Sequence, residues 1–119
     1  MSNPLALIVE DDYDLSNIFA QALQAAGFET QIFRTGDAAL VRLSSTKPDV
    51  VVLDLHLPRV AGMDILRQIR ADPRLAETRV IVATADDRQA EALQDEADLV
   101  LVKPISFSQL RDLAARLKK

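Results

Sequence analysis

The chain has no cysteine, no tryptophan and a single histidine among its 119 residues. Without cysteine it can form neither a disulfide framework nor a thiolate-ligated zinc or iron–sulfur site. The lone histidine, His56, cannot build a multi-histidine metal centre. These absences exclude a disulfide-stabilised scaffold and a transition-metal site of the usual cysteine or histidine type.

Long apolar runs are also missing. No uninterrupted run exceeds five residues, whereas a membrane-spanning helix needs about 20. The first four residues, Met1-Ser2-Asn3-Pro4, carry neither the basic region nor the apolar stretch of a signal peptide. We therefore expect a cytoplasmic chain that does not associate with membranes.

The chain has little excess charge. Eighteen acidic residues stand against 14 basic ones, for a net charge of −4, while 49% of the residues are hydrophobic and 27% charged. This balance is typical of a folded domain with a hydrophobic core, and it does not favour nucleic-acid binding. A chain of this length is expected to form one domain, which would cover residues 1–119.

Five short strand-like runs alternate with helical patterns. The predicted strands are Leu5–Val9, Glu29–Phe33, Val50–Leu53 (ending at Asp54), Val80–Ala83 (ending at Thr84) and Leu99–Val102. Apolar residues recur at helical spacing over 15–26, 39–43, 65–69 and 110–117, and a weaker helix is predicted from Arg88 to Asp95. Continuous apolar strands that alternate with helices indicate a parallel sheet covered on both faces, which is a doubly wound α/β sandwich.

The predicted ends of these elements have recognisable capping and breaking residues. Asp12 or Asp14, Thr35 and Ser106 are candidate N-caps, the last with Gln109 in a capping-box pattern. Gly27 suits the position after the first helix, because glycine adopts the left-handed conformation without strain. Pro48 and Pro73 are expected to interrupt helices. The more polar run Glu29–Phe33 suits an edge strand.

Polar residues follow four of the strands directly: Glu10, Asp11, Asp54, Thr84 and Lys103. In open parallel sheets, ligands bind beyond the carboxyl ends of the strands, at the point where the strand order reverses. With the strand order 2-1-3-4-5 of flavodoxin-like folds, the first and third strands are neighbours. The Glu10-Asp11 pair would then face Asp54.

Three carboxylates in one pocket repel one another and call for a cation. Mg2+ suits them, because it prefers oxygen ligands and binds a few carboxylates together with water and phosphate. Lys103 adds a positive charge and Thr84 a hydroxyl group, both suited to phosphoryl oxygens. Together with Asp54 as an exposed carboxylate nucleophile, these groups suit phosphoryl transfer to an aspartate.

With these motifs the chain resembles the response-regulator receiver domain of two-component signalling over essentially its whole length. The resemblance is carried by Ile8-Val9-Glu10-Asp11-Asp12, Val52-Leu53-Asp54-Leu55-His56-Leu57-Pro58, Ala83-Thr84-Ala85 and Val102-Lys103-Pro104. Each motif alone is a weak signal. In this order, each at a strand end, they are highly specific.

The resemblance implies a flavodoxin-like (βα)5 fold with strand order 2-1-3-4-5 and a definite role for each site residue. Asp54 would be the phosphoacceptor, and the Lys103-Pro104 peptide bond would be cis. Thr84 and Lys103 would contact the phosphoryl group. The ligands of Mg2+ would be Asp54, Asp11 directly, Glu10 through water and the backbone carbonyl of His56.

The resemblance also implies partners and a mode of action. The phosphoryl donor would be a sensor histidine kinase or a histidine phosphotransfer protein, and the downstream effector is unknown. Phosphorylation would shift a pre-existing equilibrium between inactive and active conformations, in a monomer or a phosphorylation-dependent dimer. The domain would not be an enzyme beyond its own Mg2+-dependent phosphorylation and dephosphorylation.

The chain departs from the family pattern in three places. Val100 stands where the family often has an aromatic residue, Glu96-Ala97-Asp98 replaces Gly-Ala-Asp, and the stretch from Thr84 to Lys103 is shorter than is common. All three departures concern signal output more than the phosphorylation pocket.

Two alternative functions stay open. A phosphohydrolase with an aspartyl-phosphate intermediate would usually place an acid two residues after the nucleophile, where this chain has His56. Turnover of an aryl phosphate would identify it. A protein-binding module that no longer needs phosphate would form a phosphate-independent complex with its partner.

Overall fold

Five parallel strands form one sheet in the order β2-β1-β3-β4-β5. The computed structural model describes residues 3–118. Its elements are β1 (Leu5–Val9), α1 (Tyr13–Ala25), β2 (Glu29–Phe33), α2 (Gly36–Leu43), β3 (Val50–Asp54), α3 (Gly62–Ala71), the 3-10 helix η1 (Pro73–Leu75), β4 (Arg79–Thr84), α4 (Asp87–Ala92), β5 (Leu99–Val102) and α5 (Phe107–Leu117). The predicted fold class and strand order are confirmed.

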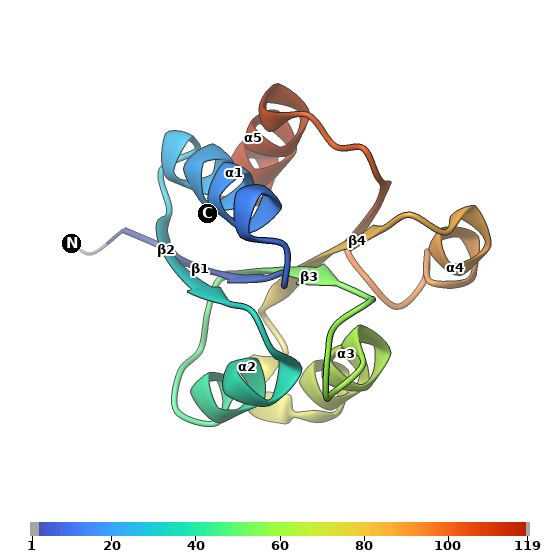
Figure 1. Ribbon diagram of the computed structural model, residues 1–119. Helices are drawn as coiled ribbons and strands as arrows, with labels where there is room; N and C mark the ends of the chain where they lie inside the picture. The colour runs from blue at the N-terminus through green and yellow to red at the C-terminus, as the bar shows by residue number, and fades with distance from the viewer. Residues whose placement is uncertain (1–2, 119) are drawn as a thin grey trace.

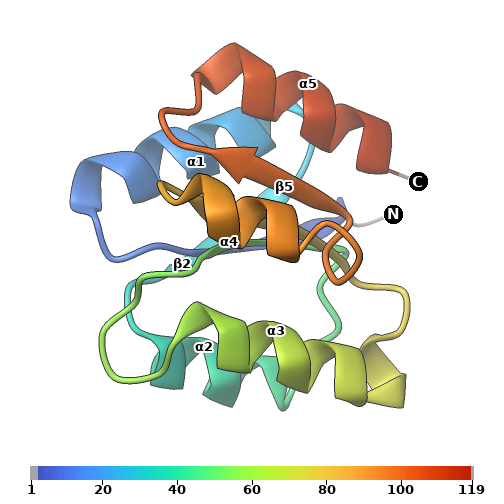
Figure 2. The ribbon, with the colours of Figure 1, turned by 90° about the vertical axis from the view of Figure 1, so that its right-hand side faces the viewer.

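The helices cover both faces of the sheet (Figure 1). Helices α1 and α5 lie together on one face, and α2 and α3 lie on the other. Helix α4 lies near the sheet edge formed by β5, as the view in Figure 2 also shows. Within the described residues, no helix has both the length and the apolar character needed to cross a membrane.

The strands divide the core into two layers, because successive side chains of a strand point to opposite faces. Leu7, Val9, Val51 and Leu53 pack against α2 and α3, whereas Ala6, Ile8, Val50 and Val52 pack under α1 and α5. All five residues of β3 are buried. This burial explains why β3 is an uninterrupted apolar run up to Asp54.

The predicted helix ends are confirmed at several caps. Asp12 accepts a hydrogen bond from the backbone N–H of Leu15 at 2.9 Å, and Ser106 accepts one from Gln109 at 3.1 Å. Thr35 caps α2. Gly27 follows α1 with a φ of 100°, in the left-handed region that favours glycine.

Two features near the helix ends differ from the prediction. Helix α4 was predicted over Arg88–Asp95 but ends at Ala92, whose side chain is exposed. The chain turns there because Leu93 and Ala97 enter the core, and the N–H of Ala97 donates to the carbonyl of Leu93 at 3.2 Å. After α3, η1 forms where only a helix stop was predicted, and the Asp72 side chain accepts from the N–H of Arg74.

One polar network joins α3 to the start of β5. Arg70 donates from Nη2 to Asp98 at 2.7 Å and from Nε to the carbonyl of Glu96 at 2.9 Å. Asp98 also accepts from the N–H of Val80 at 2.7 Å and from Arg79 at 3.3 Å. Asp98, which the Glu96-Ala97-Asp98 motif shares with the family pattern, therefore connects α3, β4 and the start of β5.

Candidate functional site

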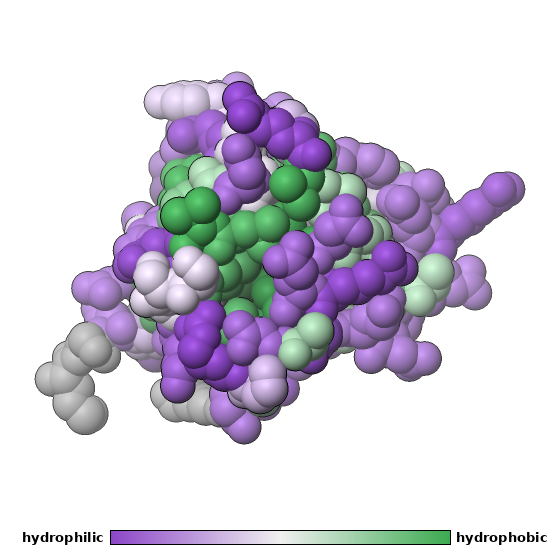
Figure 3. All heavy atoms as spheres, turned by 90° about the horizontal axis from the view of Figure 1, so that it is seen from below, coloured by the Kyte–Doolittle hydropathy of each residue, from purple (hydrophilic) through white to green (hydrophobic). Residues whose placement is uncertain are grey.

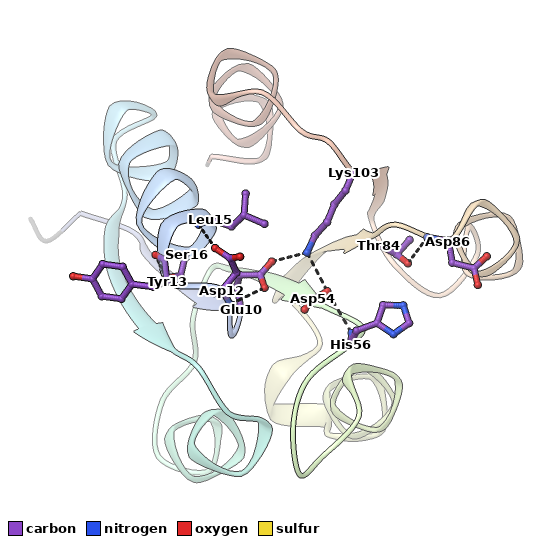
Figure 4. A network of polar contacts seen from close by, with 10 residues as sticks. All are labelled: Glu10, Asp12, Tyr13, Leu15, Ser16, Asp54, His56, Thr84, Asp86 and Lys103. Carbon is purple, nitrogen blue, oxygen red and sulfur yellow. Dashed lines mark hydrogen bonds and ion pairs between the residues drawn. The ribbon is translucent and has the colours of Figure 1, made fainter.

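Three strand ends meet at one edge of the sheet (Figure 4). Glu10 directly follows β1, Asp54 ends β3 and Lys103 directly follows β5. Because β1 and β3 are neighbours with Val9 opposite Leu53, Glu10 and Asp54 emerge side by side. The parallel topology thus gathers residues that are far apart in sequence.

The three predicted acids form a cluster. Glu10, Asp11 and Asp54 each offer a carboxylate oxygen, and these oxygens lie within 4.8 Å of one another. Glu10 and Asp54 are 1% and 3% exposed, whereas Asp11 faces solvent. The prediction that the Asp54 carboxylate is exposed is therefore wrong, because Asp54 still belongs to the buried strand β3. Two acids of the cluster are therefore buried and one is exposed to solvent. Carboxylate oxygens are hard donors, which suit Mg2+.

Lys103 reaches across the cluster. Its Nζ lies 2.7 Å from Oε1 of Glu10 and 3.4 Å from Oδ1 of Asp54. Burial alone would lower the pKa of Lys103, but its hydrogen bond to Glu10 and the charge of Asp54 outweigh this effect and raise the pKa. The lysine is thus held as an ammonium ion over the two buried acids. The predicted cis bond between Lys103 and Pro104 is present.

Glu10 is the most strongly perturbed acid of the cluster. Burial raises its pKa to about 7, and the neighbouring Asp54 charge acts in the same direction. Hydrogen bonds from Lys103 and from the backbone N–H of Asp12, the latter 3.2 Å from Oε2, partly oppose this rise. Glu10 therefore changes its protonation state near neutral pH.

Asp54 is positioned by the loop that follows it. The backbone N–H of His56 donates to Oδ1 of Asp54 at 3.3 Å. A Cβ on Gly62 would lie 2.3 Å from the carbonyl oxygen of Asp54, so this close approach requires glycine. The sequence alone does not predict this contact of Gly62. Its contact with Asp54 depends on how the loop folds back, which no local pattern encodes.

Thr84 is buried at the end of β4, and its hydroxyl bonds to residues other than the three acids. Its hydroxyl accepts from the N–H of Asp86 at 3.1 Å and donates to Oε1 of Gln89 at 3.5 Å. Its carbonyl accepts from the N–H of Lys103 at 2.7 Å. Figure 4 shows the hydroxyl turned toward Asp86 and away from Asp54. Asp86 and Gln89, which no sequence motif indicates, therefore hold this side chain.

An open hollow lies beside these residues. It has a volume of about 570 Å3 and is lined by His56, Ala85, Asp86, Asp87 and Arg88. The side chain of His56 is exposed. The hollow therefore lies beside the loops that follow β3 and β4.

A doubly wound sheet whose strand ends gather two buried acids, an exposed acid and a lysine is typical of α/β domains that bind a ligand beyond the carboxyl ends of their strands. Residues 6–115 match the family model of the response regulator receiver domain. The chain therefore belongs to the response regulator receiver family, as its sequence motifs indicated.

Several curated relatives are response regulators. The chain is 36% identical over 110 residues to the phosphate regulon transcriptional regulatory protein PhoB of Rhizobium meliloti, covering 90% of this chain and 48% of that protein. It is 36% identical over 115 residues to the sensory transduction protein RegX3 of Mycobacterium tuberculosis, covering 94% and 48%. The chain thus spans about half the length of these relatives.

Solved structures agree with this assignment. The response regulator receiver domain (CheY-like) from Methylobacillus flagellatus matches with a TM-score of 0.83 and 28% identity, covering 98% of this chain and 100% of that one. The response regulator DrrB of Thermotoga maritima matches with a TM-score of 0.83 and 29% identity, covering 97% of this chain and 52% of that one.

Proposed function

We propose that this receiver domain accepts a phosphoryl group onto the carboxylate of Asp54 from a phosphohistidine. The observation that carries the proposal is the placement of Asp54 at the end of a buried strand, 3.4 Å from the ammonium group of Lys103 and inside the acid cluster. The hydrogen bond from His56 orients the nucleophilic carboxylate.

In the proposed transfer, an oxygen of Asp54 attacks the phosphorus atom of the donor. The new O–P bond forms as the N–P bond to the donor imidazole breaks, and the imidazole leaves with the bonding electron pair. Lys103 is placed to attract a phosphoryl oxygen, because its Nζ already lies beside Asp54. The product is an acyl phosphate on Asp54, which water can later hydrolyse.

The acid cluster would hold Mg2+ through Asp11, Asp54 and, through water, Glu10. The backbone carbonyl of His56 stays a predicted further ligand. When bound, Mg2+ supplies positive charge that stabilises the transferring phosphoryl group. The donor set consists of oxygen atoms, and this chemistry suits Mg2+ better than softer metals.

Thr84 is the proposed sensor of the phosphoryl group. Its hydroxyl would exchange its bonds to Asp86 and Gln89 for a phosphoryl oxygen, and this movement would shift the domain toward its active conformation. In this proposal the domain is a switch. Its only chemistry is its own phosphorylation and dephosphorylation.

We propose a sensor histidine kinase or a histidine phosphotransfer protein as the donor, because these proteins carry phosphohistidine. The cytoplasmic location expected from the sequence is part of this proposal, and the downstream effector is not identified. The name of one relative, PhoB, describes transcriptional regulation, which would require a segment beyond a receiver domain.

Incubation with acetyl phosphate and Mg2+, followed by mass spectrometry of the peptides, tests the proposal. We expect a hydroxylamine-sensitive phosphoryl group on Asp54 that is absent in Asp54→Asn. Asp64→Asn is the matched control, because Asp64 is an exposed acid on α3 outside the cluster. Undiminished labelling of Asp54→Asn would reject Asp54 as the acceptor, and steady turnover of an aryl phosphate would favour the phosphohydrolase.

A further inference from the structure

The loop that carries Asp11 is attached at both of its ends to the end of β2. At its start, Glu10 donates its backbone N–H to the carbonyl of Phe33 at 3.0 Å. At its end, the ring of Tyr13 lies against the guanidinium group of Arg34, whose Cζ is 4.7 Å from the ring centre. Phe33 is the last residue of β2 and Arg34 follows it directly. Two adjacent residues of one strand end therefore hold the two ends of the acidic loop.

Arg34 makes a second contact with the first turn of α1. Its Nη2 donates to the hydroxyl of Ser16 at 3.1 Å, and this hydroxyl donates to the carbonyl of Tyr13 at 2.8 Å. Ser16 is buried, so its hydroxyl is not free to turn toward water. Figure 4 shows the ring of Tyr13 turned away from Asp54 and toward the side of β2. The guanidinium group thus contacts the ring of Tyr13 directly and its backbone by way of Ser16.

These contacts leave one donor of Arg34 unused. Its Nε is shielded from solvent and has no hydrogen-bond partner among the described residues. A buried N–H group without a partner costs free energy, which exposure to water would recover. Since Arg34 keeps this orientation, the ring of Tyr13 and the hydroxyl of Ser16 determine where its guanidinium group lies. A planar guanidinium group suits this combination of stacking and hydrogen bonding.

The backbone from which Arg34 extends is fixed on both sides. Before it, the whole of β2 pairs with β1. After it, α2 packs on the sheet and buries Ala39 and Leu43. Figure 3 views the molecule from the side of α2 and α3, where an apolar strip lies between hydrophilic side chains. Arg34 therefore extends from a well-packed part of the fold toward a loop whose residues 11–13 are exposed.

Asp11 depends on this attachment more than the other two acids of the cluster. Glu10 and Asp54 are buried and bonded to Lys103, whereas no hydrogen bond or ion pair within residues 3–118 fixes the Asp11 carboxylate. The position of Asp11 beside the other acids is therefore set by the backbone of the loop. Residues that hold a metal ligand in place without touching the metal commonly change its affinity about 10- to 100-fold when they are replaced.

We propose that Arg34 is a positioning residue for the cation site, which holds the acidic loop through Tyr13 and Ser16 so that Asp11 can bind the cation. This inference rests on the proposed function, because it takes the acid cluster as the Mg2+ site. Arg34 carries a positive charge, which would repel Mg2+. A purely electrostatic role would therefore have the opposite effect on affinity from the positioning role.

Calorimetric titration of the unphosphorylated protein with Mg2+ tests the proposal. We expect the Kd for Mg2+ to rise about tenfold in Arg34→Ala. Tyr13→Ala removes the ring without a change of charge and should raise the Kd similarly, whereas Tyr13→Phe keeps the ring and should retain the wild-type Kd. The double variant Arg34→Ala/Tyr13→Ala should bind about as weakly as Arg34→Ala alone, because both substitutions remove the same contact.

Arg42→Ala is the matched control. Arg42 also connects a helix to β2, through a hydrogen bond from its Nε to Oε1 of Gln31 at 2.9 Å, but it has no contact with the acidic loop. Its substitution should leave the Kd for Mg2+ unchanged even where it lowers the free energy of unfolding. Hydrogen–deuterium exchange of the metal-free protein is the second readout. Residues 11–16 should exchange faster in Arg34→Ala than in the wild type or in Arg42→Ala.

The outcomes separate this inference from the proposed function. An unchanged or lower Kd in Arg34→Ala, with Mg2+ bound by the wild type, would overturn the positioning role and leave the proposed function intact. Wild-type protein that binds no Mg2+ would overturn the proposed cation site. Amide exchange would then decide alone, since unchanged exchange in Arg34→Ala would reject the attachment of the loop and faster exchange would support it.

Discussion

Lys103 sets the electrostatic state of the site before any phosphoryl group arrives. Its ammonium group lies between the buried carboxylates of Glu10 and Asp54. A phosphoryl group on Asp54 would present new oxygen atoms to this ammonium group, and charge-assisted hydrogen bonds to phosphoryl oxygens are strong. Lys103 can therefore exchange partners during phosphorylation without supplying the nucleophile.

We predict that Lys103→Met still allows acetyl phosphate to label Asp54 but weakens the conformational response. Methionine retains an unbranched side chain and removes the charge. Amide chemical shifts of Thr84 and of residues 87–92, recorded before and after phosphorylation, measure the response and should change less than in the wild type. Lys47→Met is the control, since Lys47 is an exposed lysine outside the acid cluster. Equal shift changes in Lys103→Met and wild type would contradict the prediction.

The affinity for Mg2+ should depend on pH through Glu10. The pKa of Glu10 is about 7. Below this pH, Glu10 must release a proton when Mg2+ binds, whereas above it the Glu10 carboxylate is already ionised in most molecules. Calorimetric titration should therefore give a Kd roughly tenfold lower at about pH 8 than at about pH 6. Asp11→Ala should weaken binding at both pH values, whereas Asp14→Ala, which removes an acid outside the cluster, should not. A Kd that does not change with pH would show that Glu10 is not coupled to the site.

The sequence identified the acids and the lysine because they come directly after apolar strands. Parallel topology then determines that Glu10, Asp54 and Lys103 meet. The roles of Gly62 and Gln89 were not predicted, because each contact depends on the path of a loop. Position 62 requires glycine because the loop brings it against the carbonyl oxygen of Asp54. The sequence does not show this close approach.

At the scale of elements, α4 is the least anchored helix. It has six residues, and Ala90 is its one buried residue. Asp86 caps its start through the N–H groups of Arg88 and Gln89. Val100 packs against the α2–α3 side of the core and has no aromatic ring to move between rotamers. Few buried contacts give a segment low local stability.

We therefore predict that α4 gains order when the phosphoryl group is present. Hydrogen–deuterium exchange should show weak protection of residues 87–92 in the free protein and stronger protection with beryllofluoride bound at Asp54. Helix α5, which buries Leu110 and Ala114, serves as an internal reference that should not change. Complete protection of α4 in the free protein would contradict the prediction and leave the loops around Asp54 and Thr84 as the responding segments.

Strands were easier to predict than helix ends. The buried strands are continuous apolar runs, and their bounds agree with the prediction to within about one residue. The end of α4 could not be read from helical spacing, because Leu93 and Ala97 reach the core through a turn and not along a helix face. Similarly, Pro73 predicted the end of α3 but gave no signal for η1 after it.

At the scale of the whole molecule, Asp98 joins α3, β4 and β5. Burial alone would raise its pKa, but the hydrogen bonds from the N–H of Val80 and from Arg70 outweigh it and hold the pKa below the usual value of 3.8. The unfolded chain lacks these bonds. The stabilisation from the Asp98 carboxylate is therefore present above about pH 3.8 and is lost as the pH falls through the lower pKa of the folded state.

We predict that Asp98→Asn lowers the free energy of unfolding at neutral pH by about 1–3 kcal/mol, because it removes charge-assisted hydrogen bonds. Urea unfolding measured at neutral pH and at about pH 3 should show a smaller difference between variant and wild type at the acidic pH. Asp112→Asn, at a side chain that is 62% exposed, should have little effect at either pH. A difference that does not shrink in acid would contradict the assigned role of the Asp98 charge.

The position of α5 in the fold has a consequence for biosynthesis. Leu110 and Ala114 of α5 complete the cluster that contains Phe19, Ile81 and Ala83. Until α5 has left the ribosome, one face of the sheet lacks part of its cover, and the nascent domain exposes apolar surface of the kind that chaperones bind. A ribosome stalled before residue 107 should therefore carry a protease-sensitive chain, and protection should appear only once α5 can dock beside α1.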